Sequence, residues 1–357
     1  MTAASLPEAL AARAAPSPGT REPYTVLADR ADGTVVRCGE TVAKAHAADA
    51  DRDALAVRMR IAGHESLAGV LLPPLRTGAG YLRDRPVSLW PYGAPVDPER
   101  PEDAPWEAVA RLLAALHRIP PGRLPGPVPP MRGPAKVARA LARLAWAVPG
   151  PGPTPGPGSA QTPGQAQAPG QAQAPVPAQA PVRASGAEPG SLPSPRAAEA
   201  VRAAARTLPA WARGEAEPPP GGALCHGDLH LGQLVRYPAP DGPWLLIDVD
   251  DLGLGAPAWD LARPAAWYAS GLLDTGTWLR FLDAYRAAGG PAAGPPGRDP
   301  WPELDLAARA LTVQTAALAL SKAAEAGRRL DDVERLMVDA CARIAGLPAD
   351  LNSGPPS

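Results

Sequence analysis

Several patterns are missing from this 357-residue chain, and each absence excludes a class of protein. No long apolar run resembles a transmembrane helix, and the first residues lack the basic leader of a signal peptide. Basic and acidic residues nearly balance at a formal net charge of −1, whereas a nucleic-acid-binding protein needs a clustered positive surface. We therefore expect a cytoplasmic protein that binds neither membranes nor nucleic acids.

Cysteine and lysine are also scarce. Cys38, Cys225 and Cys341 are odd in number, widely separated and outside any metal-ligand spacing, which predicts reduced thiols. Of the 35 basic residues only three are Lys, so Lys44, which lies on a short apolar strand, departs from a strong bias toward Arg. This departure indicates a functional cation; a solvated residue at a strand edge is the alternative.

Order-promoting residues are missing from one long segment, residues 148–196. It consists mainly of Pro, Gly, Ala, Gln and Ser, and repeats the hexapeptide Pro163–Ala168 at Pro169–Ala174. Such a stretch cannot bury enough apolar area to offset its ordering entropy, so we expect a disordered insertion. A Pro-rich ligand for a partner module is the alternative interpretation.

The most informative segment present is His226–Gln233, followed by Asp248 at the end of an apolar run. A kinase needs a carboxylate that orients and deprotonates the attacking hydroxyl, and oxygen ligands that hold Mg²⁺ against the nucleotide phosphates. Asp228 fits the base, and Gln233 and Asp248 fit the two Mg²⁺ ligands. Protein kinases place the base and the metal-binding amide five residues apart, as are Asp228 and Gln233 here.

With Gly255–Ala262, these motifs resemble the aminoglycoside phosphotransferase-like small-molecule kinases, and Gly232 with Gln233 resembles the maltokinase-type branch. The resemblance implies an α+β, bilobal protein-kinase-like fold with a small antiparallel-sheet lobe and a larger, mainly helical lobe. It also implies that His226 packs beneath the loop as structural support. His230 would brace the loop or approach the phosphates, and Asp260 would fix the catalytic loop through buried hydrogen bonds.

Zinc binding by His226 and His230 is the rival interpretation of the motif. Two His four residues apart share one face of a helix, but the helical zinc motif carries Glu beside the first His, and here Gly227 stands there. The flanking residues are strand-like, which also argues against a metalloprotease. No Gly-x-Ser-x-Gly or Walker motif offers another catalytic site.

Nucleotide contacts are expected from the first lobe. Lys44 would meet the α and β phosphates, and a helical acid would pair with it, with Asp53 preferred over Asp49, Asp51 and Glu65. Trp90 and Tyr92 would line the adenine pocket at the hinge between the lobes. We predict the first lobe over residues 21–92 and the second over 93–347, with flexible ends at 1–20 and 348–357.

These features predict a kinase that transfers the γ-phosphoryl group of ATP or GTP, with Mg²⁺, to a hydroxyl of a small acceptor (aminoglycoside, sugar or amino alcohol). The turn between the first two strands has a single glycine, Gly33, where protein kinases have a glycine-rich loop. A catalytically weak nucleotide-binding pseudokinase with a regulatory role is therefore the alternative. Acidic residues after the hairpin would favour a cationic acceptor: Asp250, Asp251, Asp274, Asp299, Glu303 and Asp305.

Overall fold

The computed structural model describes residues 4–15, 23–30, 32–149, 192–219 and 222–347. These residues form two compact units. The first unit contains the described residues of Met1–Met131 together with Ala223–Leu254, and the second contains those of Arg132–Gln167, Gln179–Gly222 and Gly255–Ser357. These units differ from the lobes expected at 21–92 and 93–347, which stay a prediction. Most of the insertion expected at 148–196, and the tail expected at 348–357, lie outside the described residues.

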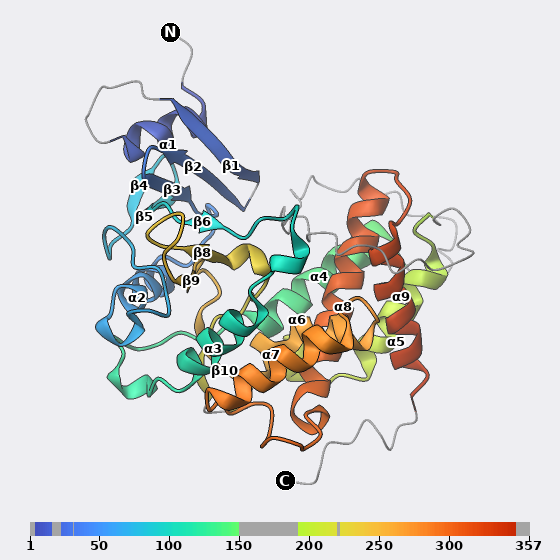
Figure 1. Cartoon of the computed structure of the whole chain (residues 1–357). Helices are drawn as coiled ribbons and strands as arrows, with labels where there is room; N and C mark the ends of the chain where they lie inside the picture. Colours follow the sequence, from blue (N-terminus) through green and yellow to red (C-terminus); the bar gives the residue numbers. More distant parts are fainter. Residues whose placement is uncertain (1–3, 16–22, 31, 150–191, 220–221, 348–357) are drawn as a thin grey trace, which may run out of the picture. The chain divides into compact units, whose positions relative to one another are not determined.

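A five-stranded antiparallel sheet in the order β1-β2-β3-β5-β4 is the core of the first unit (Figure 1). Its strands are β1 (Tyr24–Arg30), β2 (Gly33–Cys38), β3 (Thr41–Ala45), β4 (Gly80–Leu82) and β5 (Arg85–Pro91). Residues that are paired across neighbouring antiparallel strands share a face. The pairs Lys44 with Ser88 and Val42 with Trp90 therefore place Lys44, Ser88 and Trp90 on one face of the sheet.

The opposite face packs against helix α1 (Leu6–Ala14). Leu10 is fully buried there, among small apolar side chains of β2, β3 and β5. The helix begins with a capping box, because the Ser5 hydroxyl accepts from the Glu8 amide while the Glu8 carboxylate accepts from the Ser5 amide. The expectation of a flexible segment at 1–20 is therefore wrong for Leu6–Ala14, since the apolar face of this short helix completes the core.

Truncation of Leu10 to Ala is expected to destabilise the protein by about 2–5 kcal/mol, because the cavity would form in a fully buried site. Thermal unfolding of the variant measures this loss. Leu27→Ala is the matched control, since Leu27 on β1 is 49% exposed and its truncation should change stability by no more than about 0.5 kcal/mol. Equal melting temperatures for the two variants would show that α1 does not pack on the sheet.

The first unit also contains helices α2 (Arg52–Ala62) and α3 (Trp106–His117) and several short strands. The strands β6 (Ala94–Pro95), β8 (Leu234–Arg236) and β9 (Trp244–Leu246) form a second sheet, and β7 (Ala223–Cys225) pairs with β10 (Gly253–Gly255).

Leu71 forms an isolated parallel bridge with Leu246 of β9. Two hydrogen bonds make the contact, from Leu72 N to Leu246 O (2.9 Å) and from Leu246 N to Val70 O (2.9 Å). In a parallel ladder the next donor on this segment would be residue 74. Pro74 has no N–H to donate, so the ladder cannot extend further.

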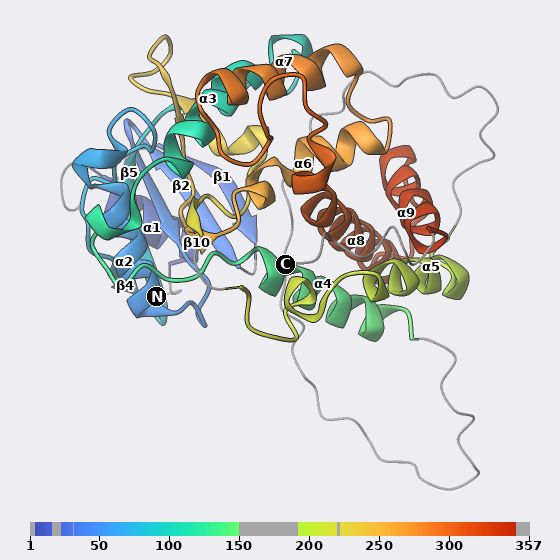
Figure 2. The same cartoon turned by 90° about the horizontal axis from the view of Figure 1, so that it is seen from below.

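Helices make up the described regular structure of the second unit. They are α4 (Gly133–Ala147), α5 (Pro195–Arg206), α6 (Ala258–Ala269), α7 (Thr275–Ala287), α8 (Trp301–Glu325) and α9 (Asp332–Ala345). Figures 1 and 2 show α8 in the middle of this unit, in contact with α4, α5, α6 and α9. Most of its residues are buried, and Arg143 of α4 forms an ion pair with Glu325, the last residue of α8.

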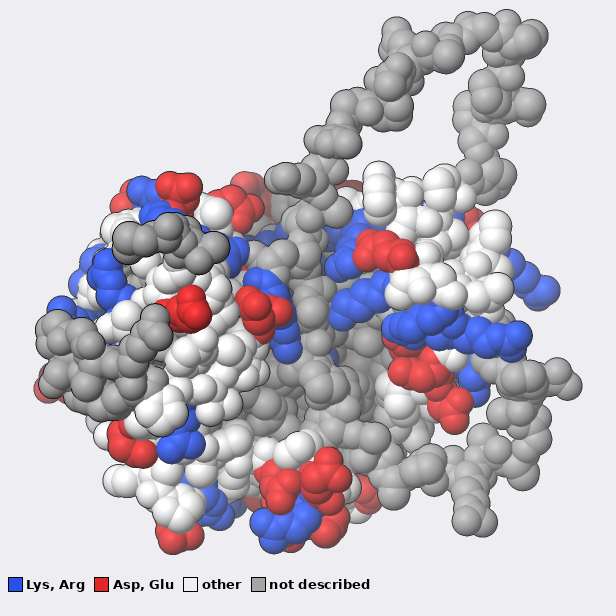
Figure 3. All heavy atoms as spheres, turned by 90° about the horizontal axis from the view of Figure 1, so that it is seen from above, with Lys and Arg blue, Asp and Glu red and all other residues white. Residues whose placement is uncertain are grey.

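None of the helices in the described part of the chain combines the length and apolar character needed to cross a bilayer. On the face drawn in Figure 3, acidic and basic side chains are interspersed. Cys38, Cys225 and Cys341 are all free and buried, as expected for reduced thiols, and burial raises the pKa of Cys341 to about 12.

Candidate active site

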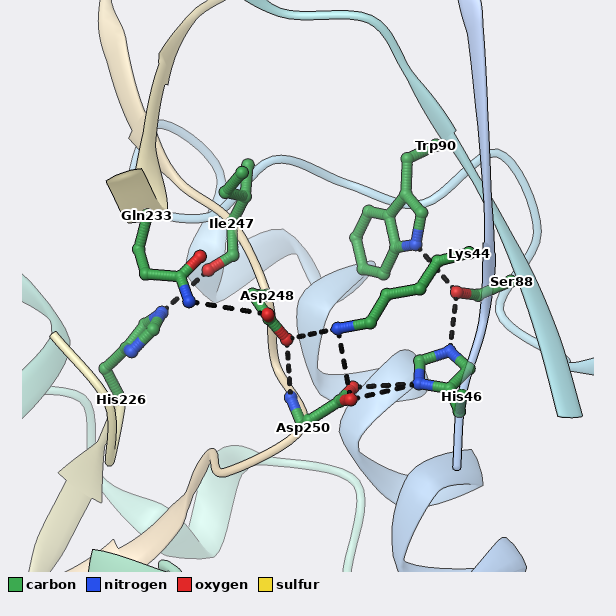
Figure 4. Close-up of polar contacts among 9 residues, drawn as sticks. All are labelled: Lys44, His46, Ser88, Trp90, His226, Gln233, Ile247, Asp248 and Asp250. Carbon is green, nitrogen blue, oxygen red and sulfur yellow. Dashed lines mark hydrogen bonds and ion pairs between the residues drawn. The ribbon is translucent and has the colours of Figure 1, made fainter. Parts of the chain in front are cut away.

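The segment between β7 and β8 carries the motif, and backbone pairing brings it to Asp248. After β7 come His226, Gly227 and Asp228, and then a short 3-10 helix, Leu231–Gln233. The amide of Ile247 donates to the carbonyl of Gln233 (2.9 Å), so the residue after Ile247 lies beside Gln233. Gln233 Nε2 is 3.4 Å from Asp248 Oδ2 (Figure 4). Two side chains that are fifteen residues apart in sequence thus meet at one point.

Gln233 and Asp248 fit a magnesium ion by the chemistry of their donor atoms. A carboxylate and an amide oxygen are the hard ligands that Mg²⁺ prefers, with water and phosphate oxygens completing its shell. The Gln233 side chain is buried, which limits its motion, whereas Asp248 is one-third exposed and open to a ligand. A turn of the Gln233 amide would bring Oε1 beside the carboxylate.

His226 braces the strand that leads to Asp248. Its Nε2 is 2.7 Å from the carbonyl oxygen of Ile247, and since a carbonyl only accepts, Nε2 is the donor. The ring is fully buried. Asp248 itself has a φ of +64°, a left-handed conformation that costs a non-glycine residue about 1–2 kcal/mol. The brace therefore acts next to a strained residue, as is common at functional sites.

Gly227 is a position where only glycine fits, and Gly232 packs closely against His230. Gly227 has a φ of +82°, and a Cβ there would lie 2.4 Å from the carbonyl oxygen of Asp251. A Cβ at Gly232 would lie 2.9 Å from the His230 ring, which therefore packs on the loop as a brace would. Asp228, next to Gly227, is half-buried. Close backbone packing thus fixes the loop that carries the predicted base.

Gly227→Ala is expected to destabilise the protein by about 2 kcal/mol or more, because the left-handed backbone and the clash with Asp251 both oppose a side chain. Thermal unfolding measures the change. Gly39→Ala is the matched control: Gly39 also has a positive φ, of +56°, but nothing lies within 4 Å of its added Cβ. If both variants lost the same stability, the close contact between a Cβ at position 227 and the Asp251 carbonyl would not contribute to the destabilisation.

Lys44 points at Asp248, but its second partner differs from the prediction. Lys44 Nζ lies 2.6 Å from Asp248 Oδ1 and 3.0 Å from Asp250 Oδ2. Asp53 is exposed on α2, so the expectation that it pairs with Lys44 is not supported. The side chain of Arg58 on the same helix is buried and donates to the carbonyl of Leu252 (2.7 Å). In this structure α2 contacts the segment after Asp250 through an arginine and not through an acid.

The electrostatics of this cluster favour its charged forms. Burial alone would lower the pKa of Lys44, but Asp248 and Asp250 outweigh it and raise that pKa above its ordinary value. Burial alone would raise the pKa of Asp250, but His46 and Lys44 outweigh it and hold that pKa well below its ordinary value. At neutral pH Lys44 is therefore a cation and Asp250 a carboxylate.

A chain of hydrogen bonds that was not predicted from the sequence holds the Asp250 side chain. His46 Nδ1 lies 3.0 Å from Asp250 Oδ1, and His46 Nε2 lies 2.7 Å from Ser88 Oγ. The Trp90 indole donates to the same hydroxyl at 2.8 Å (Figure 4). Strand alternation was the available signal, since His46 follows Lys44 by two residues and therefore shares its face of the sheet.

Trp90 and Tyr92, the two aromatic residues predicted to line the adenine pocket, have different surroundings. Trp90 is buried on the Lys44 face of the sheet, where the prediction needs an aromatic for the nucleotide. Tyr92 packs beneath the Arg37 guanidinium, 3.3 Å from the ring centroid, and its amide donates to the Glu40 carbonyl (2.8 Å). The Tyr92 ring is therefore covered by Arg37, and its N–H is already paired.

The predicted site residue of the second unit is Asp260. It is fully buried in the first turn of α6, which suits a hydrogen-bonding and structural role. Of the acids proposed to line an acceptor site, Asp274 caps α7 and Asp305 forms an ion pair with Arg309. Asp250 pairs with Lys44, and Asp299 accepts from the Trp301 amide (3.1 Å). These acids already have other interactions, which weakens the prediction of an acidic lining.

Comparisons with known proteins find one matching family and several similar folds. The family model described as "Phosphotransferase enzyme family" (APH) matches residues 24–304. A choline/ethanolamine kinase family protein from Mesorhizobium loti matches at 17% identity with a TM-score of 0.51, over 96% of this chain and 95% of the other. A thermostable mutant of aminoglycoside phosphotransferase APH(4)-Ia, in a ternary complex with AMP-PNP and hygromycin B, matches at 12% identity with a TM-score of 0.52, over 92% and 94%. No curated protein sequence matches the chain.

Proposed function

We propose that this chain, which belongs to the phosphotransferase enzyme family (APH), uses Asp228 as the base and Gln233 with Asp248 as Mg²⁺ ligands in phosphoryl transfer to a small-molecule hydroxyl. Members of this family are small-molecule kinases that phosphorylate hydroxyl groups, and the expected kinase-like α+β fold is confirmed. The observation that carries the proposal is the meeting of Gln233, Asp248 and Lys44 at one point in the first unit.

Each of these residues has a distinct role in the proposal. Mg²⁺, held by Gln233 and Asp248, would neutralise charge on the phosphates, and Lys44 would meet the α and β phosphates from the sheet. Trp90, on the same face of the sheet as Lys44, would contribute an aromatic surface for the purine. Asp228 would accept the proton of the acceptor hydroxyl and orient its oxygen. Because the transition state is loose, positioning and charge neutralisation supply most of the catalysis.

The donor is ATP or GTP, and the acceptor is an aminoglycoside, a sugar or an amino alcohol. Two similar structures support the amino-alcohol and aminoglycoside candidates. One is a choline/ethanolamine kinase family protein, and the other is an aminoglycoside phosphotransferase in complex with AMP-PNP and hygromycin B. The resemblance of Gly232 and Gln233 to the maltokinase-type loop favours a sugar. Because this motif lies next to the proposed metal ligands and is not expected to contact the acceptor, a direct screen of acceptors is needed to identify the acceptor class.

A catalytically weak nucleotide-binding protein is the second candidate, favoured by one observation at the β1–β2 turn. A Cβ at Gly33 would lie 4.0 Å from Lys44 Cε, so this turn is next to the predicted phosphate site. Asp32 precedes Gly33 in the turn, and burial raises its pKa. An acid beside the phosphates, where kinases have glycine-rich backbone, would weaken their binding.

Thermal melts with ATP, with GTP and without nucleotide, each with and without Mg²⁺, test the nucleotide site. A ligand at one hundred times its dissociation constant stabilises the folded state by about 2.7 kcal/mol, which corresponds to a rise of several degrees. We expect a rise that requires Mg²⁺. The same melting temperature under all six conditions would contradict the proposed site.

A further inference from the structure

We infer that Asp250 is the carboxylate that positions Lys44 for the nucleotide, in the role for which the sequence favoured an acid of α2. The inference rests on the proposed function and adds a positioning residue to it. Asp250 Oδ2 is 3.0 Å from Lys44 Nζ. The four candidate acids of the α2 region, Asp49, Asp51, Asp53 and Glu65, are all exposed, and Asp51 caps the helix by accepting from the Ala54 amide.

A directional set of hydrogen bonds holds Asp250 in place. The indole N–H of Trp90 can only donate, so Ser88 Oγ accepts from it, and the same hydroxyl is hydrogen-bonded to His46 Nε2. An ionised carboxylate can only accept, so His46 Nδ1 donates to Asp250. His46 and Ser88 are both buried: His46 directly follows β3, the strand of Lys44, and Ser88 is paired with Lys44 on the neighbouring strand β5. The sheet thereby fixes the carboxylate that faces Lys44.

Lys44 needs a second carboxylate partner because Asp248 is also a proposed metal ligand. In the proposed reaction Asp248 binds Mg²⁺, which competes with its 2.6 Å ion pair to Lys44. Asp250 is free of that task and remains as a partner for Lys44 when the metal takes Asp248. Among the described residues, Lys44 forms ion pairs with Asp248 and Asp250. If the Asp250 charge is removed, Asp248 is the one acidic partner left. Lys44 and Mg²⁺ would then compete for the Asp248 carboxylate.

The inference therefore predicts a change in metal dependence. Asp250→Asn keeps the size of the side chain and an acceptor for His46 but removes the charge opposite Lys44. Partners that orient the ligands of a metal are worth about 10–100-fold in metal affinity. We expect the Mg²⁺ concentration that half-saturates ATP binding to rise by about tenfold or more.

Calorimetric titration of ATP into the purified full chain, repeated at a series of Mg²⁺ concentrations, measures this change. Asp53→Asn is the matched control and should keep the parental Mg²⁺ dependence, since Asp53 is exposed on α2. Asp250→Glu restores the charge at a longer reach and should recover part of the loss. Ser88→Ala breaks the support of His46 and should give a smaller change in the same direction.

The outcomes separate this inference from the proposed function. If the parent binds no ATP with Mg²⁺, the proposed function fails. If the parent binds ATP and Asp250→Asn keeps its Mg²⁺ dependence, the inference is overturned while the proposed function stands. If Asp53→Asn shows the rise and Asp250→Asn does not, the helical acid is the positioning residue. Should Asp250→Asn fail to fold, the Ser88→Ala titration decides: parental Mg²⁺ dependence in this variant overturns the inference.

Discussion

Replacement of Asp228 by Asn is expected to slow phosphoryl transfer by about 100- to 10,000-fold, the usual contribution of a positioned general base. Asn is nearly isosteric with Asp but cannot accept the hydroxyl proton. Asp228 is half-buried on a loop fixed by the close packing of Gly227 and by the His226 brace, so the substitution should leave the fold intact. The rate of product formation at saturating ATP and acceptor measures the effect.

Two further measurements on this variant separate chemistry from binding. The melting temperature and the affinity for ATP with Mg²⁺ should both stay near parental, because Asp228 is assigned no role in holding the nucleotide. Asp241→Asn is the control, since Asp241 is exposed in the turn of the β8–β9 hairpin. Near-parental turnover by the Asp228 variant would remove Asp228 from the mechanism.

Replacement of Asp248 by Ala is expected to abolish both metal-dependent nucleotide binding and turnover. The variant removes one of two proposed metal ligands and also one of the two carboxylates that hold Lys44. ATP should then give no Mg²⁺-dependent rise in melting temperature, in contrast to the Asp228 variant, which should keep it. Melts with ATP over a range of Mg²⁺ concentrations make the comparison.

Stability gives an independent check on the Asp248 variant. Asp248 has a left-handed backbone, which Ala tolerates less well than Asp, so some loss of stability without ligand is expected. Asp241→Ala controls for loss of a carboxylate on the same hairpin. A folded Asp248→Ala protein with a parental Mg²⁺ response would show that the metal, if bound, lies elsewhere.

The sequence was sufficient for the parts of the site that depend on short-range order. The fixed spacing of Asp228, Gln233 and Asp248 predicted residues of one catalytic hairpin, and the structure brings Gln233 and Asp248 into contact. Lys44 was predicted from one cation on an apolar strand, and it lies 2.6 Å from Asp248. Their roles in catalysis stay a prediction until the variants are measured.

The parts that failed depend on contacts between distant segments. Lys44 is 206 residues from Asp250 in the sequence, and an exposed acid such as Asp53 looks no different from a buried one in a single chain. Helix α1 was missed because it is short and gains its stability from packing on the sheet.

The most direct test is ADP formation from ATP with Mg²⁺ by the parent chain, measured alone and with each of a panel of aminoglycosides, sugars and amino alcohols. Mass spectrometry of the acceptors accompanies it. The account predicts that at least one acceptor accelerates ADP formation and gains one phosphoryl group, and that Asp228→Asn loses both effects. Metal-dependent ATP binding with no ADP formed under any condition would contradict it and leave a nucleotide-binding protein without transfer activity.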